Sequence, residues 1–174
     1  MSKRSAIFLD RDGTLIHEVN FLSRVEDLQI FDFTFDALTS LKDAGFALVV
    51  TTNQSGIGRG LYSEDDMHAI HREIDARQGG LIDAYYFCPH LPDEGCFCRK
   101  PGIGMIEAAC KDLELSTDGS WMIGDKRLDI EMAIAAKLKS AMVLTGYGME
   151  HQHLLEQRPD VIAEDLAQAA RSIL

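Results

Sequence analysis

The fold is decided by nine residues near the start of the chain, Ala6-Ile-Phe-Leu-Asp-Arg-Asp-Gly-Thr14. The apolar residues that open this stretch are typical of a buried parallel strand. The strand ends in two aspartates, Asp10 and Asp12, and Gly13 behind them permits a tight bend. One such carboxylate can hold a divalent cation and attack an electrophile while the other transfers a proton. The stretch therefore predicts a strand that carries a catalytic pair at its carboxyl end.

The length and charge of the chain limit the classes of function it can have. Its 174 residues fit a single domain, which we expect to span residues 1–174. The formal net charge of -11 would repel nucleic acid and anionic membranes, so we expect neither as a partner. No stretch approaches the roughly 20 apolar residues of a membrane span. The first predicted strand starts directly behind the N-terminal residues, so cleavage of a signal peptide there would destroy the strand. We therefore expect a cytoplasmic protein. We also expect it to be a monomer.

Apolar runs alternate with helical patterns along the whole chain. Strands are predicted at residues 5–9, 46–50, 84–87, 121–123 and 141–144 and near Val161, with helices between them. This alternation predicts an α/β fold, a doubly wound parallel sheet with helices on both faces and no large cap domain. Asp10, Thr52, the cysteine-rich loop and Asp125 each follow a predicted strand. Ligands bind beyond the carboxyl ends of such strands, so we expect these residues to meet at one edge.

The helix predicted before Gly79 has a clear start and a clear apolar face. Ser63 and Asp66 resemble a capping box. The buried face is predicted to consist of Met67, Ile70, His71 and Ile74. The histidines outside the cysteine-rich loop, His71 included, show no pattern that predicts a partner.

Together these motifs resemble the haloacid dehalogenase superfamily of aspartate-based phosphatases, whose fold is Rossmann-type. Asp10 is the candidate nucleophile, and Asp12 the candidate acid that protonates the leaving alcohol and then activates water. The resemblance implies that Thr52 binds a phosphoryl oxygen and that Lys100 places a cation on the phosphoryl group. The stretch Gly124-Asp-Lys-Arg-Leu-Asp129 is similar to the motif whose acidic residues complete the metal site in this superfamily. Mg²⁺ is expected on the Asp10 carboxylate, the Asp12 backbone carbonyl and Asp125.

A second cluster lies in the loop of residues 88–98, where three thiols and an imidazole fall within eleven residues. Its members are Cys88, His90, Cys96 and Cys98. This Cys₃His set is typical of a closed structural zinc site, although reduced cysteines gathered by chance and a redox pair are the alternatives. Zinc here would fix the chain that presents Arg99 and Lys100.

The zinc loop narrows the resemblance to the small phosphatases of the histidinol-phosphate and heptose-bisphosphate group. The stretch Thr52-Asn-Gln-Ser-Gly-Ile-Gly-Arg-Gly60 is similar to a substrate loop of that group, which implies substrate contacts by Asn53, Gln54 and Ser55. Arg99 and Lys126 are implied to contact the distal part of a small phosphorylated sugar.

The resemblance implies Mg²⁺-dependent removal of the C7 phosphate of a heptose 1,7-bisphosphate through an aspartyl-phosphate, in the synthesis of heptose precursors of the cell envelope. Only five residues separate His90 from Cys96, a spacing also found in histidinol-phosphate phosphatases, which are therefore the alternative. A catalytically silent, zinc-stabilised binding module and a transferase acting on another acceptor are further alternatives. The intact acids and Lys100 argue against the binding module.

Overall fold

The computed structural model describes residues 3–174 and contains one parallel sheet. Within that range six strands run in the order β3-β2-β1-β4-β5-β6, and every neighbouring pair is parallel. The strands are β1 (Arg4–Leu9), β2 (Ala47–Asn53), β3 (Ala84–Cys88), β4 (Leu115–Gly124), β5 (Lys139–Val143) and β6 (Val161–Ala163). The predicted α/β class and parallel sheet are confirmed. The predicted domain of residues 1–174 stays a prediction, and its first two residues lie outside the described range.

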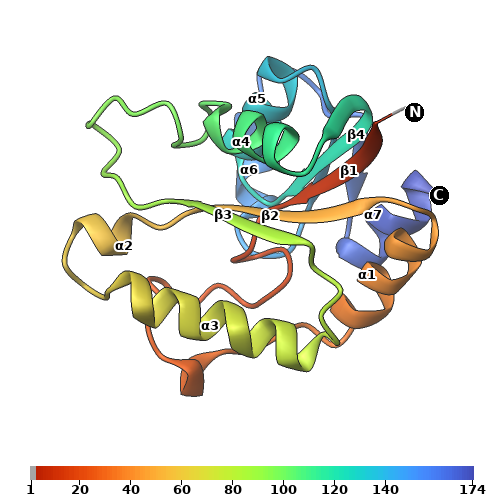
Figure 1. The fold of residues 1–174 in the computed structure, drawn as a ribbon. Helices are drawn as coiled ribbons and strands as arrows, with labels where there is room; N and C mark the ends of the chain where they lie inside the picture. Colours follow the sequence, from red (N-terminus) through yellow and green to blue (C-terminus); the bar gives the residue numbers. More distant parts are fainter. Residues whose placement is uncertain (1–2) are drawn as a thin grey trace.

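Helices cover both faces of the sheet, as a doubly wound fold requires (Figure 1). The α-helices are α1 (Thr34–Asp43), α2 (Ser55–Gly58), α3 (Glu64–Arg77), α4 (Gly104–Asp112), α5 (Arg127–Ala135), α6 (Gly148–His151) and α7 (Leu166–Ile173), with short 3₁₀ helices at Val25–Asp27 and Gln152–Leu154. Helices α4 and α5 lie on one face, and α1, α3 and α7 on the other. No helix among residues 3–174 is both long and apolar enough to cross a membrane.

Strand β1 lies in the middle of the sheet and is buried on both sides. Ile7 and Leu9 belong to the core beneath α1, α3 and α7, while Ala6 and Phe8 belong to the core beneath α4 and α5. All four side chains are 0% exposed. Burial on both faces explains why the strand reads as a continuous apolar run and not as an alternating one.

The order of strands reverses at β1, and this reversal fixes the place of the site. Chain-order neighbours extend from β1 to β2 and β3 on one side, whereas β4, β5 and β6 continue on the other. The backbone N–H of Asp10 donates to the carbonyl of Ile123 at 2.9 Å, so the ends of β1 and β4 lie side by side. A crevice at such a reversal is where α/β folds of this type bind ligands.

Strands β2 and β4 extend furthest beyond their predicted ranges. Strand β2 continues through Thr52 to Asn53, so Thr52 is in the sheet and not in a loop behind it. Strand β4 begins at Leu115, and its first half pairs with Arg4 and Ser5 before the register shifts. Exposed polar residues in that first half hide its strand character from an apolar pattern. In α1, Leu38 is buried, whereas Phe35, three residues before it, is 46% exposed.

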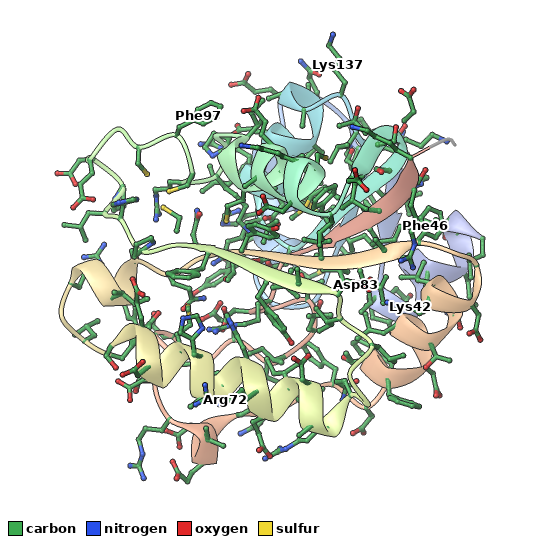
Figure 2. All side chains as sticks on the ribbon, viewed as in Figure 1. Lys42, Phe46, Arg72, Asp83, Phe97 and Lys137 are labelled. Carbon is green, nitrogen blue, oxygen red and sulfur yellow. The ribbon has the colours of Figure 1, made fainter. Side chains whose placement is uncertain are left out.

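Helix α3 is confirmed in its start and in its buried face. The Ser63 hydroxyl accepts from the Asp66 N–H at 3.1 Å, and Asp66 accepts from the Ser63 N–H at 2.8 Å. All four residues predicted for its apolar face are buried. The loop behind α3 is tied to the sheet by Asp83, which accepts from Lys42 Nζ at 2.7 Å and from the Leu48 N–H at 2.8 Å (Figure 2).

Candidate active site and Cys/His loop

A pocket of about 210 Å³ opens at the carboxyl edge of the sheet. Every residue predicted for catalysis or substrate binding lines it. They are Asp10, Asp12, Thr52, Asn53, Gln54, Ser55, Arg99, Lys100 and Lys126. Asp125, the remaining predicted magnesium ligand, is fully buried at the end of β4 beside this pocket. The sheet therefore brings together residues that are far apart in the sequence.

Lys100 is buried in the floor of the site between two carboxylates. Its Nζ donates to Asp10 Oδ1 at 2.8 Å, to Asp129 Oδ1 at 2.7 Å and to the Thr51 carbonyl at 2.9 Å. Burial favours the neutral amine, but the two carboxylates outweigh it and raise the pKa of Lys100. Burial likewise opposes ionisation of Asp10, yet Lys100 and Lys126 lower the pKa of its carboxyl group. Asp10 is therefore ionised, as a nucleophile must be.

Asp125 is the group in the site with an unsatisfied charge. Its Oδ2 accepts from the Tyr147 N–H at 2.8 Å, whereas its buried Oδ1 has no hydrogen-bond partner among residues 3–174. Burial, followed by repulsion from Asp10 and Asp129, raises the pKa of Asp125 to about 9. The excess of negative charge and the orphaned oxygen both fit a divalent cation. Carboxylate oxygens of these three residues all lie within 4.8 Å of one another.

Gly13 packs directly against the Asp125 carboxylate, which leaves no room for a side chain at position 13. Gly13 has φ of +84°, and a Cβ there would lie 2.2 Å from Asp125 Oδ2. Glycine is thus required at this place both for its backbone conformation and for the close approach of the carboxylate.

The structure shows the partners of both Asp129 oxygens, which its spacing in the sequence could not predict. One oxygen binds Lys100, and the other accepts from the Lys126 N–H at 3.0 Å, at the start of α5. Both oxygens therefore already have protein partners, whereas Asp125 retains a free one. Burial, the largest cause, raises the pKa of Asp129 to about 6 even though Lys100 opposes the shift. Of the two acids, Asp125 is the better candidate for a metal ligand.

Asp12 is held by a network that sequence analysis did not find. The Arg11 guanidinium donates through Nε to Asp12 Oδ2 at 2.9 Å and through Nη2 to Oδ1 at 3.1 Å. Gln54 Nε2 donates to Asp12 Oδ2 at 3.2 Å and to Thr52 Oγ1 at 2.8 Å. The Tyr62 hydroxyl donates to Gln54 Oε1. Gln54 was predicted as a substrate contact, and its side chain is 3% exposed and engaged with protein groups.

Two histidines outside the Cys/His loop have partners that no sequence pattern indicated. His71 Nε2 lies 3.1 Å from Nη1 of Arg11, a residue of the loop that follows β1. His151 Nδ1 accepts from the Arg127 N–H at 3.0 Å. Both partners come from segments distant in the sequence, so no local spacing could have revealed them.

The outer part of the pocket carries cations. Lys126 Nζ lies 3.8 Å from Glu18 Oε2 and 5.0 Å from the centre of the Tyr147 ring. Arg99 Nη1 donates to the His90 carbonyl at 3.3 Å, which ties it to the Cys/His loop. Asn53 binds the backbone of Lys100, accepting from its N–H at 3.0 Å. Glu18 and Tyr147 line the pocket and were not assigned from the sequence.

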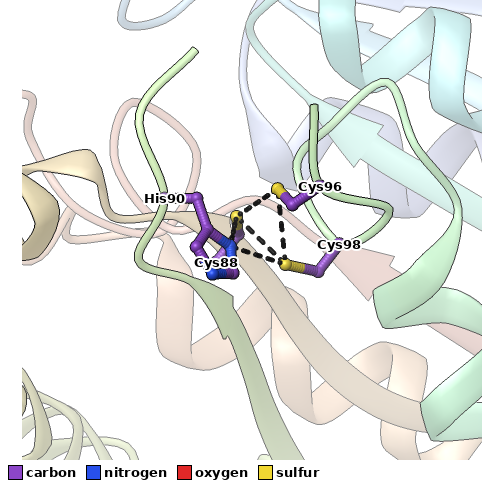
Figure 3. Close-up of side chains that lie close together, drawn as sticks. All are labelled: Cys88, His90, Cys96 and Cys98. Atoms are coloured by element: carbon purple, nitrogen blue, oxygen red, sulfur yellow. Dashed lines mark hydrogen bonds between the residues drawn. The ribbon is translucent and has the colours of Figure 1, made fainter. Parts of the chain in front are cut away.

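The four predicted zinc ligands form one cluster (Figure 3). The three Sγ atoms lie 3.2 to 3.7 Å apart, and His90 Nδ1 lies 3.4 Å from Cys88 Sγ and 3.2 Å from Cys98 Sγ. Sulfur atoms on a tetrahedral zinc ion stand about 3.8 Å apart, given Zn–S bonds of about 2.3 Å. The donor set and its spacing thus fit zinc, and Lys100 follows two residues behind Cys98.

The chain is similar to known proteins over nearly its whole length. A family model described as HAD-hydrolase-like matches residues 97–169. A D-glycero-D-manno-heptose-1,7-bisphosphate 7-phosphatase of Thermosynechococcus vestitus is 41% identical, covering 98% of this chain and 95% of the relative. A D-glycero-beta-D-manno-heptose-1,7-bisphosphate 7-phosphatase of Pseudomonas putida is 36% identical, covering 97% of this chain and 98% of that protein.

A solved structure has the same architecture. The D,D-heptose 1,7-bisphosphate phosphatase of B. bronchiseptica, in complex with magnesium and phosphate, superposes with a TM-score of 0.90 at 32% sequence identity. The match covers 97% of each chain.

Proposed function

Because the chain belongs to the family of D-glycero-D-manno-heptose-1,7-bisphosphate 7-phosphatases, we propose that it removes the C7 phosphate of this sugar bisphosphate. The reaction is the Mg²⁺-dependent hydrolysis of a phosphate monoester, and its product serves the synthesis of activated heptose for the cell envelope. We further propose that the enzyme works as a cytoplasmic monomer on this small phosphorylated sugar.

One observation carries the proposal: Lys100 is held between Asp10 and Asp129, beside the orphaned oxygen of Asp125. A carboxylate that attacks a phosphate monoester must overcome the repulsion between two anions. Lys100 supplies one positive charge at the nucleophile, and Asp125 supplies an anionic site where a cation can add more. A module that only binds would have no use for this arrangement.

The first half of the reaction transfers the phosphoryl group to Asp10. A carboxylate oxygen of Asp10 attacks phosphorus, and the bond between phosphorus and the C7 oxygen breaks. Asp12 gives its proton to the leaving oxygen, which departs as the alcohol. Thr52 and Lys100 hold phosphoryl oxygens during transfer, so the developing charge is met by groups already in place.

The second half hydrolyses the aspartyl-phosphate. Asp12, now a carboxylate, takes a proton from a water molecule, whose oxygen attacks phosphorus. The bond between phosphorus and the Asp10 oxygen breaks, which releases inorganic phosphate and restores both side chains. The same group thus serves as acid in one half and as base in the other.

Both metals of the proposal have donor sets that suit them. Asp10, Asp125 and the Asp12 backbone carbonyl would hold Mg²⁺, which supplies positive charge to the phosphoryl oxygens when bound. Cys88, His90, Cys96 and Cys98 would hold zinc in a structural role. With zinc bound, the loop presents Arg99 and Lys100 to the pocket in a fixed position.

Substrate choice is assigned to the two cations in the outer pocket. Any monoester could use Asp10, Thr52 and Lys100, so selectivity has to come from contacts with the rest of the molecule. Arg99 can donate two parallel hydrogen bonds to a second phosphate or to sugar hydroxyls, and Lys126 adds charge nearby. Histidinol phosphate carries an amine that these cations would repel, which argues against the alternative substrate.

The test is phosphate release by the purified protein with added Mg²⁺. We expect a higher kcat/KM for heptose 1,7-bisphosphate than for histidinol phosphate and for the heptose 1-phosphate product. A higher kcat/KM for histidinol phosphate would replace this proposal with the histidine-pathway alternative. Failure to hydrolyse any phosphate monoester would refute this proposal and leave the binding module and the transferase as alternatives.

A further inference from the structure

We propose that His71 and Arg11 are positioning residues for Asp12 and that together they leave Asp12 Oδ1 free to exchange the catalytic proton. This inference rests on the proposed function, in which Asp12 protonates the leaving alcohol. It assigns a task to two buried groups that neither touch the transferred phosphoryl group in the mechanism above nor belong to either metal site.

The hydrogen bonds around Asp12 distinguish its two oxygens. Oδ2 accepts from Arg11 Nε at 2.9 Å and from Gln54 Nε2 at 3.2 Å, which occupies both of its lone pairs. Oδ1 accepts only from Arg11 Nη2, at 3.1 Å, among the contacts of the described chain. One lone pair of Oδ1 is left, and Asp12 lines the pocket. Oδ1 is therefore the oxygen that can carry a proton to the substrate and back.

The fork of Arg11 controls the plane of this carboxyl group. Two parallel donors to one carboxylate fix its rotation, which a single hydrogen bond would not do. The Arg11 side chain is 1% exposed, so solvent cannot readily replace a lost partner. Its Nη2 also donates to Gln54 Oε1 at 3.2 Å, and its Nη1 lies 3.1 Å from His71 Nε2. The orientation of Asp12 thus depends on what holds the far side of the guanidinium.

His71 is suited to hold that far side. Arginine has no acceptor, so His71 Nε2 must accept and the ring proton resides on Nδ1. Burial, together with the charge of Arg11 and the neighbouring His68, lowers the pKa of His71 to about 3. The imidazole consequently stays neutral and keeps its acceptor.

The His71 ring is itself fixed by the sheet. It stacks on the Tyr85 ring of β3, with 4.3 Å between centroids and 15° between planes. The Tyr85 hydroxyl donates to Asp75 Oδ1 at 2.9 Å, one helical turn beyond His71 on α3. A continuous path of contacts therefore runs from α3 and β3 through the guanidinium to the proton-transferring carboxyl group.

The experiment compares substrates that need a proton donor to different degrees. The sugar bisphosphate leaves as an alcohol and requires the acid, whereas p-nitrophenyl phosphate leaves as a stable anion. We expect His71→Leu to lower kcat/KM by about 10- to 100-fold for the bisphosphate, part of the 10²- to 10⁴-fold that an acid contributes. For the aryl ester the loss should stay below about threefold.

Matched variants separate orientation from damage to the fold. His71→Gln keeps an acceptor and should recover most of the activity toward the bisphosphate. Ile74→Val removes a methyl group from the same buried face of α3 and should alter the ratio between the substrates little. If His71→Leu does not fold, Arg11→Lys retains the buried charge without the fork and should cause the same selective loss.

A double-mutant cycle decides whether the residues act through Asp12. In an Asp12→Asn background, His71→Leu should cause no further loss with the bisphosphate. Equal losses for both substrates, or a full additional loss in that background, would overturn the inference. Wild-type enzyme inactive toward both esters would instead refute the proposed function, so the two failures are distinguishable.

Discussion

The carboxylate edge (Asp10, Lys100, Asp125 and Asp129) and the Cys/His loop (residues 88–98) are the two proposed metal sites, and they are assembled in opposite ways. The residues of the edge are at most 5% exposed and come from strand ends and loops that the sheet brings together. The loop gathers its four ligands from eleven consecutive residues, and its Phe97 is 60% exposed and points outward (Figure 2).

This difference indicates what each region needs in order to form. Burial of the sheet on both faces assembles the edge, and Lys100 compensates much of its negative charge without any ion. The loop contains no comparable core, so under the proposal a bound zinc ion would supply the energy that orders it. The edge should therefore survive the loss of its metal, whereas the loop should not.

The largest expected effect comes from Asp10→Asn at the edge. It removes the proposed nucleophile with almost no change in volume, so turnover should fall by about 10⁴-fold or more while the fold persists. Phosphate release measures the first result, and circular dichroism with thermal unfolding measures the second. Asp32→Asn, on the surface, serves as the matched control. Substantial activity in Asp10→Asn protein free of contaminating phosphatase would rule out the covalent mechanism.

Cys96→Ser should break the loop and displace Lys100, but it should leave the sheet and the three carboxylates of the edge in place. Metal analysis should find about one zinc ion per wild-type chain and much less in the variant. Displacement of Arg99 and Lys100 should lower kcat/KM by about 10²-fold, the size expected for small misplacements. Cys110→Ser changes a thiol outside the cluster and should retain both zinc and activity. Fully active wild-type protein purified without chelator and lacking zinc would contradict the role given to this loop.

Arg99→Ala tests the link between the two regions. The loss in kcat/KM for the bisphosphate should be about 1.5–3 kcal/mol, the size of a hydrogen bond to a charged group. A small monophosphate, which does not reach Arg99, should lose much less. Arg72 projects from the outer face of α3, so Arg72→Ala is the control (Figure 2). Equal losses for both substrates would assign Arg99 to the reaction centre and remove the basis for heptose selectivity.

The smallest expected effect is a pH dependence of folding stability that comes from the buried residue His71. The unfolded chain protonates His71 near its ordinary pKa of about 6.5, whereas burial and Arg11 keep it neutral in the fold down to about 3. Folding stability is therefore lost as the pH falls below about 6.5. Relative to His71→Gln, the wild type should lose about 2 kcal/mol between pH 7 and pH 5. Urea unfolding at both pH values measures this, and an unchanged difference would mean that His71 is protonated in the fold.

Local patterns sufficed for much of the fold and for the composition of the site. The buried strand β1, the capped helix α3 and the parallel order follow from apolar runs and turn residues that can be read one segment at a time. The nine predicted catalytic and substrate residues share one pocket because parallel strands deliver their carboxyl ends to the same edge. The first half of β4 escaped prediction, since its side chains are polar and exposed even though its backbone pairs with β1.

The sequence by itself determined which chemical groups the site contains, because strand ends in a parallel sheet must converge. Only the tertiary structure decided how those groups are paired. It placed Asp129 on Lys100, left Asp125 Oδ1 free, and set His71 of α3 against Arg11, sixty residues apart in the chain. Such pairings depend on the packing of one element against another and on burial, which makes each unmatched charge costly. Neither the packing of elements nor the burial of a residue can be predicted from the local spacing of residues in the sequence.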